Sequence, residues 1–85
     1  MKKKFNLFYT KEFHKQFNCL DKSVKVRVLR EMEFLESNPL AGKVLTGDFS
    51  GFRSFRVGNY RVIYQQIEQG LKIMLIEHRK KVYDI

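Results

Sequence analysis

The fold is decided by residues 52–77, which read FRSFRVGNYRVIYQQIEQGLKIMLIE. This stretch holds three runs rich in β-branched and aromatic residues, which predict strands over Phe52–Val57, Tyr60–Ile67 and Leu71–Glu77. The first connection, Gly58-Asn59, is a two-residue turn of the kind that favours a tight β-hairpin, and Glu68-Gln69-Gly70 forms the second. We therefore predict an antiparallel meander of three strands.

Upstream of the meander, the sequence predicts a strand and a two-helix hairpin. Apolar and polar positions alternate from Lys3 to Tyr9, as in a strand. Thr10 is suited to cap a helix over Lys11–Leu20, and Asp21 is suited to cap a second and longer helix. Asn38-Pro39 ends that helix, because a residue before proline is pushed away from helical angles. The second helix is expected to bury a stripe of Val24, Val28, Met32 and Leu35, widened by Leu29.

These elements predict a single α+β domain over residues 1–85. The first strand is expected to join the meander in one sheet, with the helices packed on one face. Residues between Pro39 and Phe52 show little periodicity and hold three glycines, which predicts a loop. Tyr60 and Tyr64 alternate along a strand and are expected to serve the core and the sheet rather than as stacking platforms.

The charge balance favours a polyanionic partner. The chain has 17 Lys and Arg against 9 Asp and Glu, a net charge of +8, which points most simply to nucleic acid. Cys19 alone forms no internal disulfide, which suits a reducing cytoplasm. One cysteine and two histidines are too few for an ordinary four-ligand zinc site, and no apolar run reaches the length of a membrane span. We expect a cytoplasmic protein without metal, cofactor or membrane partner.

A basic cluster is expected at one end of the meander. Along its strand Arg61 alternates with Val62 and Tyr64, so it projects from the opposite face to theirs. Arg56 lies on the preceding strand, across a tight turn, and Arg79 follows the last strand. The sequence therefore predicts one phosphate-binding region that draws on Arg53, Arg56, Arg61, Arg79, Lys80 and Lys81.

Two segments of the chain resemble a known toxin superfamily. Leu45-Thr46-Gly47, followed by RSFRVGNYRVIY over residues 53–64, resembles the signature of the RelE/ParE superfamily, and HRKKVY over residues 78–83 resembles its usual C-terminus. Asn59 stands where Asp is common, and both residues suit a turn. With the helical region before Pro39, the likeness covers nearly the whole chain. It implies a RelE-like fold, and a type II toxin wrapped by a cognate RelB-like antitoxin.

The resemblance also bears on activity, because the superfamily has two functional branches. RelE-like members are ribosome-dependent endoribonucleases that cut mRNA in the ribosomal A site. ParE-like members share the fold but inhibit DNA gyrase and lack the catalytic basic and aromatic residues. This chain keeps Arg56, Arg61, Arg79 and Tyr83 where the nuclease branch has functional groups, which favours RNA cleavage. It departs at Ser54, where some nuclease members carry a second Lys or Arg, and this leaves open whether Arg53 compensates.

RNA cleavage by internal transfer gives these residues distinct expected roles. The 2′-hydroxyl must lose a proton, and fixed cations must stabilise the charge that develops on phosphorus and on the leaving oxygen. Our hypothesis is that Arg61 binds the scissile phosphate and that Arg79 supports the leaving group, while Arg56 adds positive potential. Arg53, Lys80 and Lys81 are assigned to RNA binding.

The general base has two candidates, Tyr83 and His78. An ordinary tyrosine pKa of about 10 matches neutral pH poorly, although neighbouring cations favour the phenolate. Histidines titrate nearer to neutrality. Tyr83 ranks first on the resemblance alone. Two other functions stay as alternatives: a ParE-like gyrase inhibitor, and a non-catalytic RNA-binding module, which the lack of an RNP-like aromatic motif disfavours.

Overall fold

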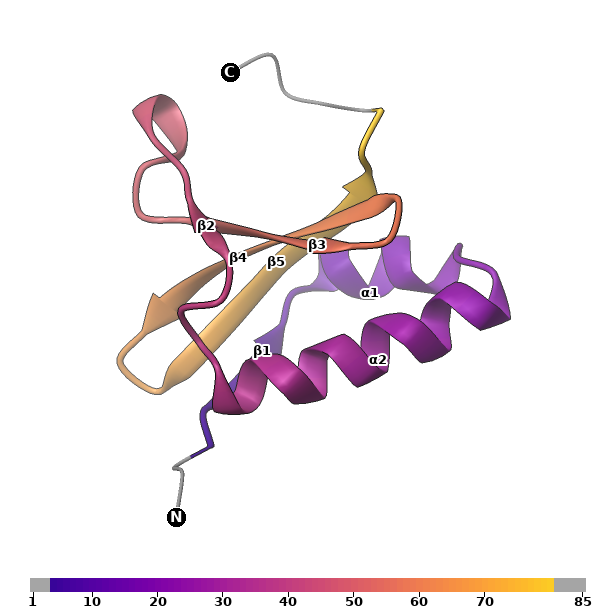
Figure 1. The fold of residues 1–85 in the computed structure, drawn as a ribbon, viewed down its shortest axis with the longest axis horizontal. Coiled ribbons are helices and arrows are strands. Elements are labelled where there is room, and N and C mark those ends of the chain that lie inside the picture. Colours follow the sequence, from indigo (N-terminus) through magenta and orange to yellow (C-terminus); the bar gives the residue numbers. More distant parts are fainter. Residues whose placement is uncertain (1–3, 81–85) are drawn as a thin grey trace.

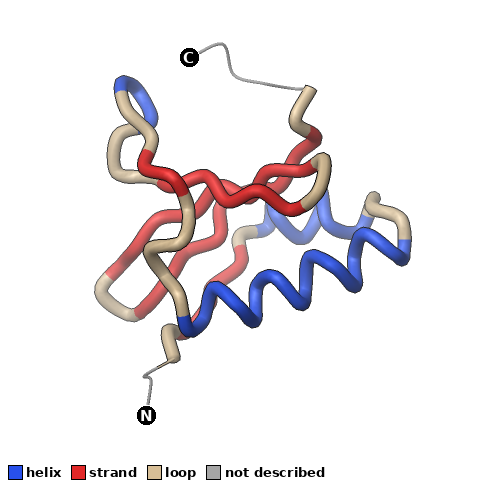
Figure 2. Tube along the Cα trace, in the orientation of Figure 1, coloured by secondary structure: helices blue, strands red, loops and turns tan. Residues whose placement is uncertain are grey.

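The predicted meander forms the centre of a five-stranded sheet in the computed structural model, which describes residues 4–80 (Figures 1 and 2). The strands of the sheet are β1 (Asn6–Tyr9), β2 (Lys43–Val44), β3 (Arg53–Val57), β4 (Tyr60–Ile67) and β5 (Gly70–His78). They lie in the order β1-β5-β4-β3-β2. Strand β1 runs parallel to β5, and the other neighbours are antiparallel. The α+β fold, the meander and the entry of the first strand into the same sheet are confirmed.

Two helices cover one face of this sheet (Figure 2). Helix α1 (Lys11–Asn18) is shorter than predicted by two residues, and α2 (Lys22–Ser37) ends at the predicted boundary before Asn38. Thr10 caps α1 as expected, because its Oγ1 accepts a hydrogen bond from the Phe13 amide at 3.0 Å. The same hydroxyl donates to the Met74 carbonyl on β5 at 2.6 Å, so the cap also fixes α1 against the sheet.

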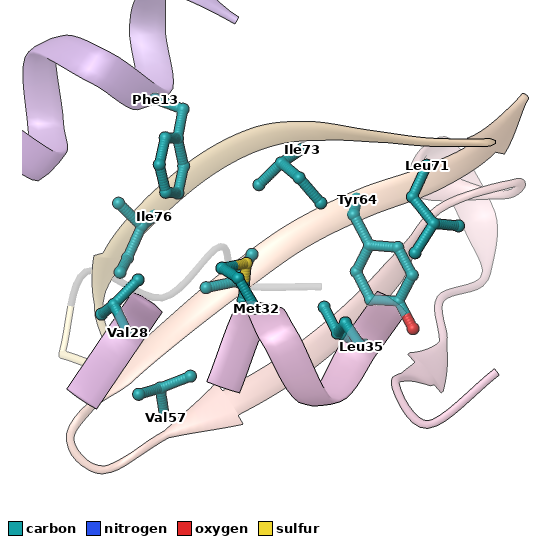
Figure 3. Packing of buried hydrophobic residues seen from close by; sticks show 10 residues of the cluster. Phe13, Val28, Met32, Leu35, Val57, Tyr64, Leu71, Ile73 and Ile76 are labelled. Carbon is teal, nitrogen blue, oxygen red and sulfur yellow. The ribbon is translucent and has the colours of Figure 1, made fainter. Parts of the chain in front are cut away.

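The hydrophobic core lies between α2 and the sheet (Figure 3). It is built from side chains that are at most 3% exposed, among them Phe13, Val28, Met32, Leu35, Val57, Tyr64, Leu71, Ile73 and Ile76. The prediction that Leu29 widens the helical stripe is wrong, since this side chain is 55% exposed. Leu29 comes one position after Val28, which rotates it by about 100° around the helix and away from the sheet.

A bulge in β5 changes which residues face the helices. Ile63 pairs with Leu75 while Tyr64 pairs with Ile73, so β5 carries one extra residue, Met74. Ile73 and Ile76 are therefore both in the core although they are three residues apart. Leu75 is brought opposite Ile63 instead, on the face of the sheet without helices.

The segment between α2 and β3 is more ordered than the predicted loop. It holds the two-residue strand β2 and a short 3-10 helix, η1 (Gly47–Phe49), which are too short to show a periodicity in the sequence. The hydroxyl of Tyr64 anchors its start, donating to the Pro39 carbonyl at 2.8 Å and accepting from the Gly42 amide at 2.9 Å. A side chain at residue 42 has no room, because its Cβ would lie 2.7 Å from the Tyr64 ring. Burial raises the pKa of Tyr64, which keeps the hydroxyl neutral and able to donate.

We expect Tyr64→Phe to lower the free energy of unfolding by about 1–3 kcal/mol, because the buried Gly42 amide and the Pro39 carbonyl each lose their partner. Urea denaturation followed by circular dichroism measures the loss. Tyr60→Phe is the matched control, since Tyr60 is only half-buried. Equal effects of the two substitutions would contradict the anchoring role.

Candidate nucleic-acid interface

The face of the sheet opposite α1 and α2, called here the open face, carries the two strand arginines predicted to meet. Arg56 on β3 and Arg61 on β4 are direct cross-strand partners. Both line one depression of about 300 Å³, together with Lys43, Leu45 and Ser54. The predicted approach of Arg56 and Arg61 is confirmed. On its other side, Arg61 has Glu77 of β5 as its cross-strand partner, and an opposite charge there offsets part of the repulsion between the two arginines.

A second depression, of about 420 Å³, lies at the end of β5. It is lined by Asn59, Arg61, His78, Arg79 and Lys80. Arg61 borders both depressions, so the two form one continuous cationic surface. The Arg79 amide donates to the Asn59 carbonyl at 2.8 Å, which holds residue 79 beside the β3–β4 turn. Gly58 in that turn has φ 60°, a left-handed angle that favours glycine. The expectation that Arg79 meets Arg61 at the end of the last strand is therefore confirmed.

His78 is held in a defined orientation at this end. Its ring packs edge-on against the cross-strand neighbour Tyr60, with centroids 5.2 Å apart and an interplanar angle of 76°. Its Nδ1 accepts a hydrogen bond from the Lys80 amide at 3.2 Å. This leaves Nε2 as the ring nitrogen available to a ligand in the second depression.

Arg53 does not join the cationic surface, although the sequence grouped it there. Its Nη1 donates to the Gly42 carbonyl at 2.8 Å and to the Leu40 carbonyl at 3.4 Å, so the guanidinium braces the segment after α2. The reason is strand parity, because Arg53 and Ser54 face opposite sides. Arg53 therefore does not compensate for Ser54.

A lysine that the sequence analysis missed takes the place of the cation absent at Ser54. Lys43 on β2 is the cross-strand partner of Ser54, and both line the first depression. Only the pairing of β2 with β3 reveals this, since residues 43 and 54 are far apart in the chain. Lys81 and Tyr83, the remaining predicted site residues, lie outside the described residues.

A third depression, of about 270 Å³, lies beside the cationic surface and is apolar. Its apolar lining comes from the segment around η1 and from the centre of the sheet: Leu45, Phe49, Phe52, Ile63, Met74 and Leu75. Asp48 also borders it. Leu45 lines both this depression and the first one, which joins the apolar and cationic regions. Sequence reasoning noted Leu45-Thr46-Gly47 as a motif but assigned it no place in a site.

The chemistry available on the open face is that of an anion-binding surface. Within residues 4–80, the charged residues that line the two depressions include Lys43, Arg56, Arg61, Arg79 and Lys80, and Glu77 is the cross-strand partner of Arg61 on β5. In the same part of the chain, no three His, Cys, Asp or Glu side chains are grouped as in a metal site, and neither helix is long and apolar enough to cross a membrane. Clustered arginine and lysine of this kind bind phosphate groups.

Comparisons with known proteins match this fold to toxins. Residues 7–83 match the family model of the ParE toxin of type II toxin–antitoxin systems, parDE. The RelBE2 toxin–antitoxin complex of Mycobacterium tuberculosis contains a chain with 25% identity and a TM-score of 0.78, over 89% of this chain and 99% of that one. The archaeal RelE–RelB complex of Pyrococcus horikoshii gives 24% identity and a TM-score of 0.74, over 93% and 99%. A search of curated protein sequences found no match.

We expect the open face to bind single-stranded RNA with an affinity that falls as salt rises. Each phosphate contact contributes about 0.7 to the slope of log K against log salt, so Arg56→Gln is expected to reduce that slope by about 0.7. Fluorescence anisotropy with a short labelled RNA measures it. Arg30→Gln, at an exposed position of α2, is the matched control. A larger effect at residue 30 than at residue 56 would place binding elsewhere.

Proposed function

This chain belongs to the ParE toxin family of type II toxin–antitoxin systems, and we propose that it acts as an endoribonuclease that cleaves mRNA on the ribosome. The observation that carries the proposal is the position of Arg61, which borders both cationic depressions of the open face. An RNA backbone that crosses this face places a phosphate beside Arg61, with further cations on either side. The chain also keeps Arg56, Arg61, Arg79 and Tyr83 where the nuclease branch of the superfamily has functional groups, which supports the same activity.

The cleavage proceeds by internal transfer. The 2′-oxygen of one nucleotide attacks the adjacent phosphorus, the bond from phosphorus to the 5′-oxygen breaks, and a 2′,3′-cyclic phosphate forms. The transition state carries more negative charge on the phosphoryl oxygens than the ground state, so fixed positive groups accelerate the reaction. Arginine is suited to this task because its planar fork binds two oxygens and keeps its charge at a half-buried position such as that of Arg61.

Each cation of the open face has a role in this scheme. Arg61 binds the scissile phosphate. Arg79, which borders the same depression, stabilises the leaving 5′-oxygen. Arg56 and Lys43 hold the backbone on the other side of Arg61, while Lys80 and Lys81 bind RNA near the end of the chain. Arg53 is left out, since it is engaged with the segment after α2.

The physiological partner we propose is an antitoxin of the RelB type. The two similar solved structures described above are toxin–antitoxin complexes, with RelB named as the partner in the archaeal one. An acidic segment that covered the open face would neutralise the paired charges of Arg56 and Arg61 and would exclude RNA. Charge complementarity of this kind accelerates association and improves specificity. The same binding would stabilise a small domain with a thin margin of stability.

Inhibition of DNA gyrase is the second candidate, because the matching family model is named for ParE. The fold alone does not separate the two activities, since RelE-like and ParE-like proteins share it. The open face favours RNA cleavage, because Arg61 borders two cationic depressions, and a protein that inhibits gyrase by binding has no need of such a phosphate site. An assay of both targets with the same preparation decides between them.

Primer extension on an mRNA held in programmed ribosomes, beside the same mRNA free in solution, tests the nuclease. We expect cuts only on the ribosome. Arg61→Ala is expected to lower the cleavage rate about 10²–10³-fold, by analogy with the loss of one preorganised donor to a developing anion. Arg30→Ala, exposed on α2, serves as the control.

Circular dichroism checks that both variants are folded. Absence of cuts by the folded wild-type protein, together with inhibition of gyrase supercoiling, would replace the nuclease with the second candidate.

Two further substitutions identify the general base. Tyr83→Phe is expected to lower the cleavage rate by about 10²–10⁴, the usual contribution of a positioned acid or base, and His78→Gln by much less. Single-turnover cleavage rates across a pH series measure the effect of each substitution. Loss of the true base removes the limb of the pH–rate profile that reports the deprotonation of that base. The reverse order of effects would assign the base to His78. Because its Nδ1 accepts from the Lys80 amide, the neutral ring carries its proton on Nε2, so the ring would have to release that amide before it could accept a proton.

A further inference from the structure

The last residues of β5 lie beside a helix rather than beside another strand (Figure 1). Strand β1 accompanies β5 only as far as the pair of Tyr9 with Ile73, and the chain then enters α1. Within residues 4–80, no strand pairs with that edge of β5 after Ile73. The backbone amides that point to this edge therefore need other partners.

The side chain of Gln16, on α1, supplies one of these partners. Its Oε1 accepts a hydrogen bond from the Ile76 amide at 2.9 Å, although the two residues are 60 positions apart in the chain. Phe13 on the same helix is 3% exposed, so it anchors α1 to the core and Gln16 extends from a rigid element. The bond therefore fixes the backbone of β5 at Ile76 from the side of the helices.

This bond controls orientation rather than burial. The side chain of Ile76 is 2% exposed and belongs to the core, so the residue would remain in the core without its partner. The amide bond instead sets how the peptide plane of Ile76 is turned. That plane determines the direction in which the chain continues to residues 77–79, because the backbone has only two soft dihedral angles per residue.

Arg79 lies three residues after Ile76 and depends on that direction. Its amide donates to the Asn59 carbonyl at 2.8 Å, so the end of β5 is held from two sides, by the β3–β4 turn and by Gln16. Arg79 borders the second depression together with Arg61. A cation that stabilises a developing charge must be placed closely, since a displacement of about 1 Å can cost about 10² in rate.

We propose that Gln16 is a positioning residue for RNA cleavage, and that its bond to the Ile76 amide places the Arg79 guanidinium at the leaving 5′-oxygen. Gln16 acts through the backbone of β5 and is not a catalytic residue. This inference rests on the proposed function, since it takes Arg79 to stabilise the leaving oxygen. Loss of the bond weakens that one task and spares the binding of the scissile phosphate at Arg61.

A substrate whose leaving group needs no cation separates these two tasks. The probe is an mRNA with sulfur in place of the 5′-oxygen at the scissile bond, held in programmed ribosomes beside the all-oxygen mRNA. The 2′-oxygen loses its proton and attacks phosphorus, the phosphorus–sulfur bond breaks, and sulfur leaves with the electron pair as a thiolate. A thiol is much more acidic than an alcohol, so the thiolate leaves without a neighbouring arginine. Single-turnover rates are measured for both mRNAs.

Gln16→Met keeps the length of the side chain and removes the acceptor oxygen. We expect this variant to cleave the all-oxygen mRNA about 10–10²-fold more slowly than the wild type, and the sulfur-substituted mRNA at nearly the wild-type rate. Arg79→Ala is expected to show the same pattern, whereas Arg61→Ala slows the cleavage of both mRNAs. Gln16→Glu retains an acceptor oxygen and is expected to restore most of the rate.

Thr10→Val is the matched control for a general loss of stability. It removes the hydrogen bond to the Met74 carbonyl and the cap of α1, so we expect it to lower the melting temperature at least as much as Gln16→Met does. It acts five residues before Arg79, and the ratio of the two cleavage rates is expected to stay at the wild-type value. Thermal unfolding followed by circular dichroism measures the stability of each variant.

Amide hydrogen exchange, followed by NMR, tests the same link without any cleavage. In Gln16→Met we expect the amides of Ile76 and Arg79 to exchange about tenfold faster than in the wild type, the effect of one lost hydrogen bond on local opening. In Thr10→Val the Arg79 amide is expected to exchange at the wild-type rate.

Equal slowing of the two mRNAs by Gln16→Met would overturn the proposal, because the bond would then support the site as a whole. Unchanged exchange at Arg79 in that variant would also overturn it, even if cleavage were slower. A wild-type protein that cuts neither mRNA, but in which Gln16→Met still loosens Arg79, would lose the nuclease and keep the placement of Arg79 by Gln16.

Discussion

The open face depends on one buried hydroxyl, that of Tyr64. It accepts from the Gly42 amide and donates to the Pro39 carbonyl, which ties the segment that leaves α2 to the centre of the sheet. Arg53 adds a second tie to the same segment through the Gly42 carbonyl. The Leu45 amide, just past β2, adds a hydrogen bond to the Phe52 carbonyl at 3.0 Å. These ties matter because the two residues of β2 by themselves contribute few hydrogen bonds and bury little surface. Lys43 and Leu45 reach the open face only because that register is kept.

The two faces of the sheet divide the side chains of residues 53–64 between the core and the candidate site. Side chains on one face of the sheet, including Val57, Val62 and Tyr64, are buried against the helices. Arg56 and Arg61 lie on the other face, the open face. A sequence pattern typical of the toxin superfamily therefore contains both kinds of constraint in alternation. This explains why a match to the family model by itself establishes the fold and leaves the activity to the residues of the open face.

The charge arrangement carries a cost for the free protein. Arg56 and Arg61 are direct partners across β3 and β4, and Arg79 and Lys80 add further positive charge nearby. Glu77, the partner of Arg61 on β5, offsets part of this repulsion, and an anion that binds the open face, whether an RNA backbone or an acidic protein segment, relieves more of it. The same surface would thus serve both the target and the antitoxin, and the two ligands would exclude one another. Competition at a shared surface needs no conformational change in the toxin.

The sequence by itself determined the elements and their order. Alternation and turn residues specified three strands, and periodicity specified two helices, of which only the first receives the predicted side-chain cap, since Asp21 makes no such hydrogen bond. Alternation also placed Arg61 and Tyr64 on opposite faces of β4. These features are local, set by residues within a few positions of one another. Tertiary structure alone decided the rest. The bulge at Met74 moved Leu75 to the open face and Ile76 to the core. The pairing of β2 with β3 brought Lys43 beside Ser54. The carbonyls of Leu40 and Gly42 accept hydrogen bonds from Arg53 and so keep it away from the cationic surface. Each of these outcomes depends on contact between segments distant in the chain, and such contacts leave no periodic signal in the sequence.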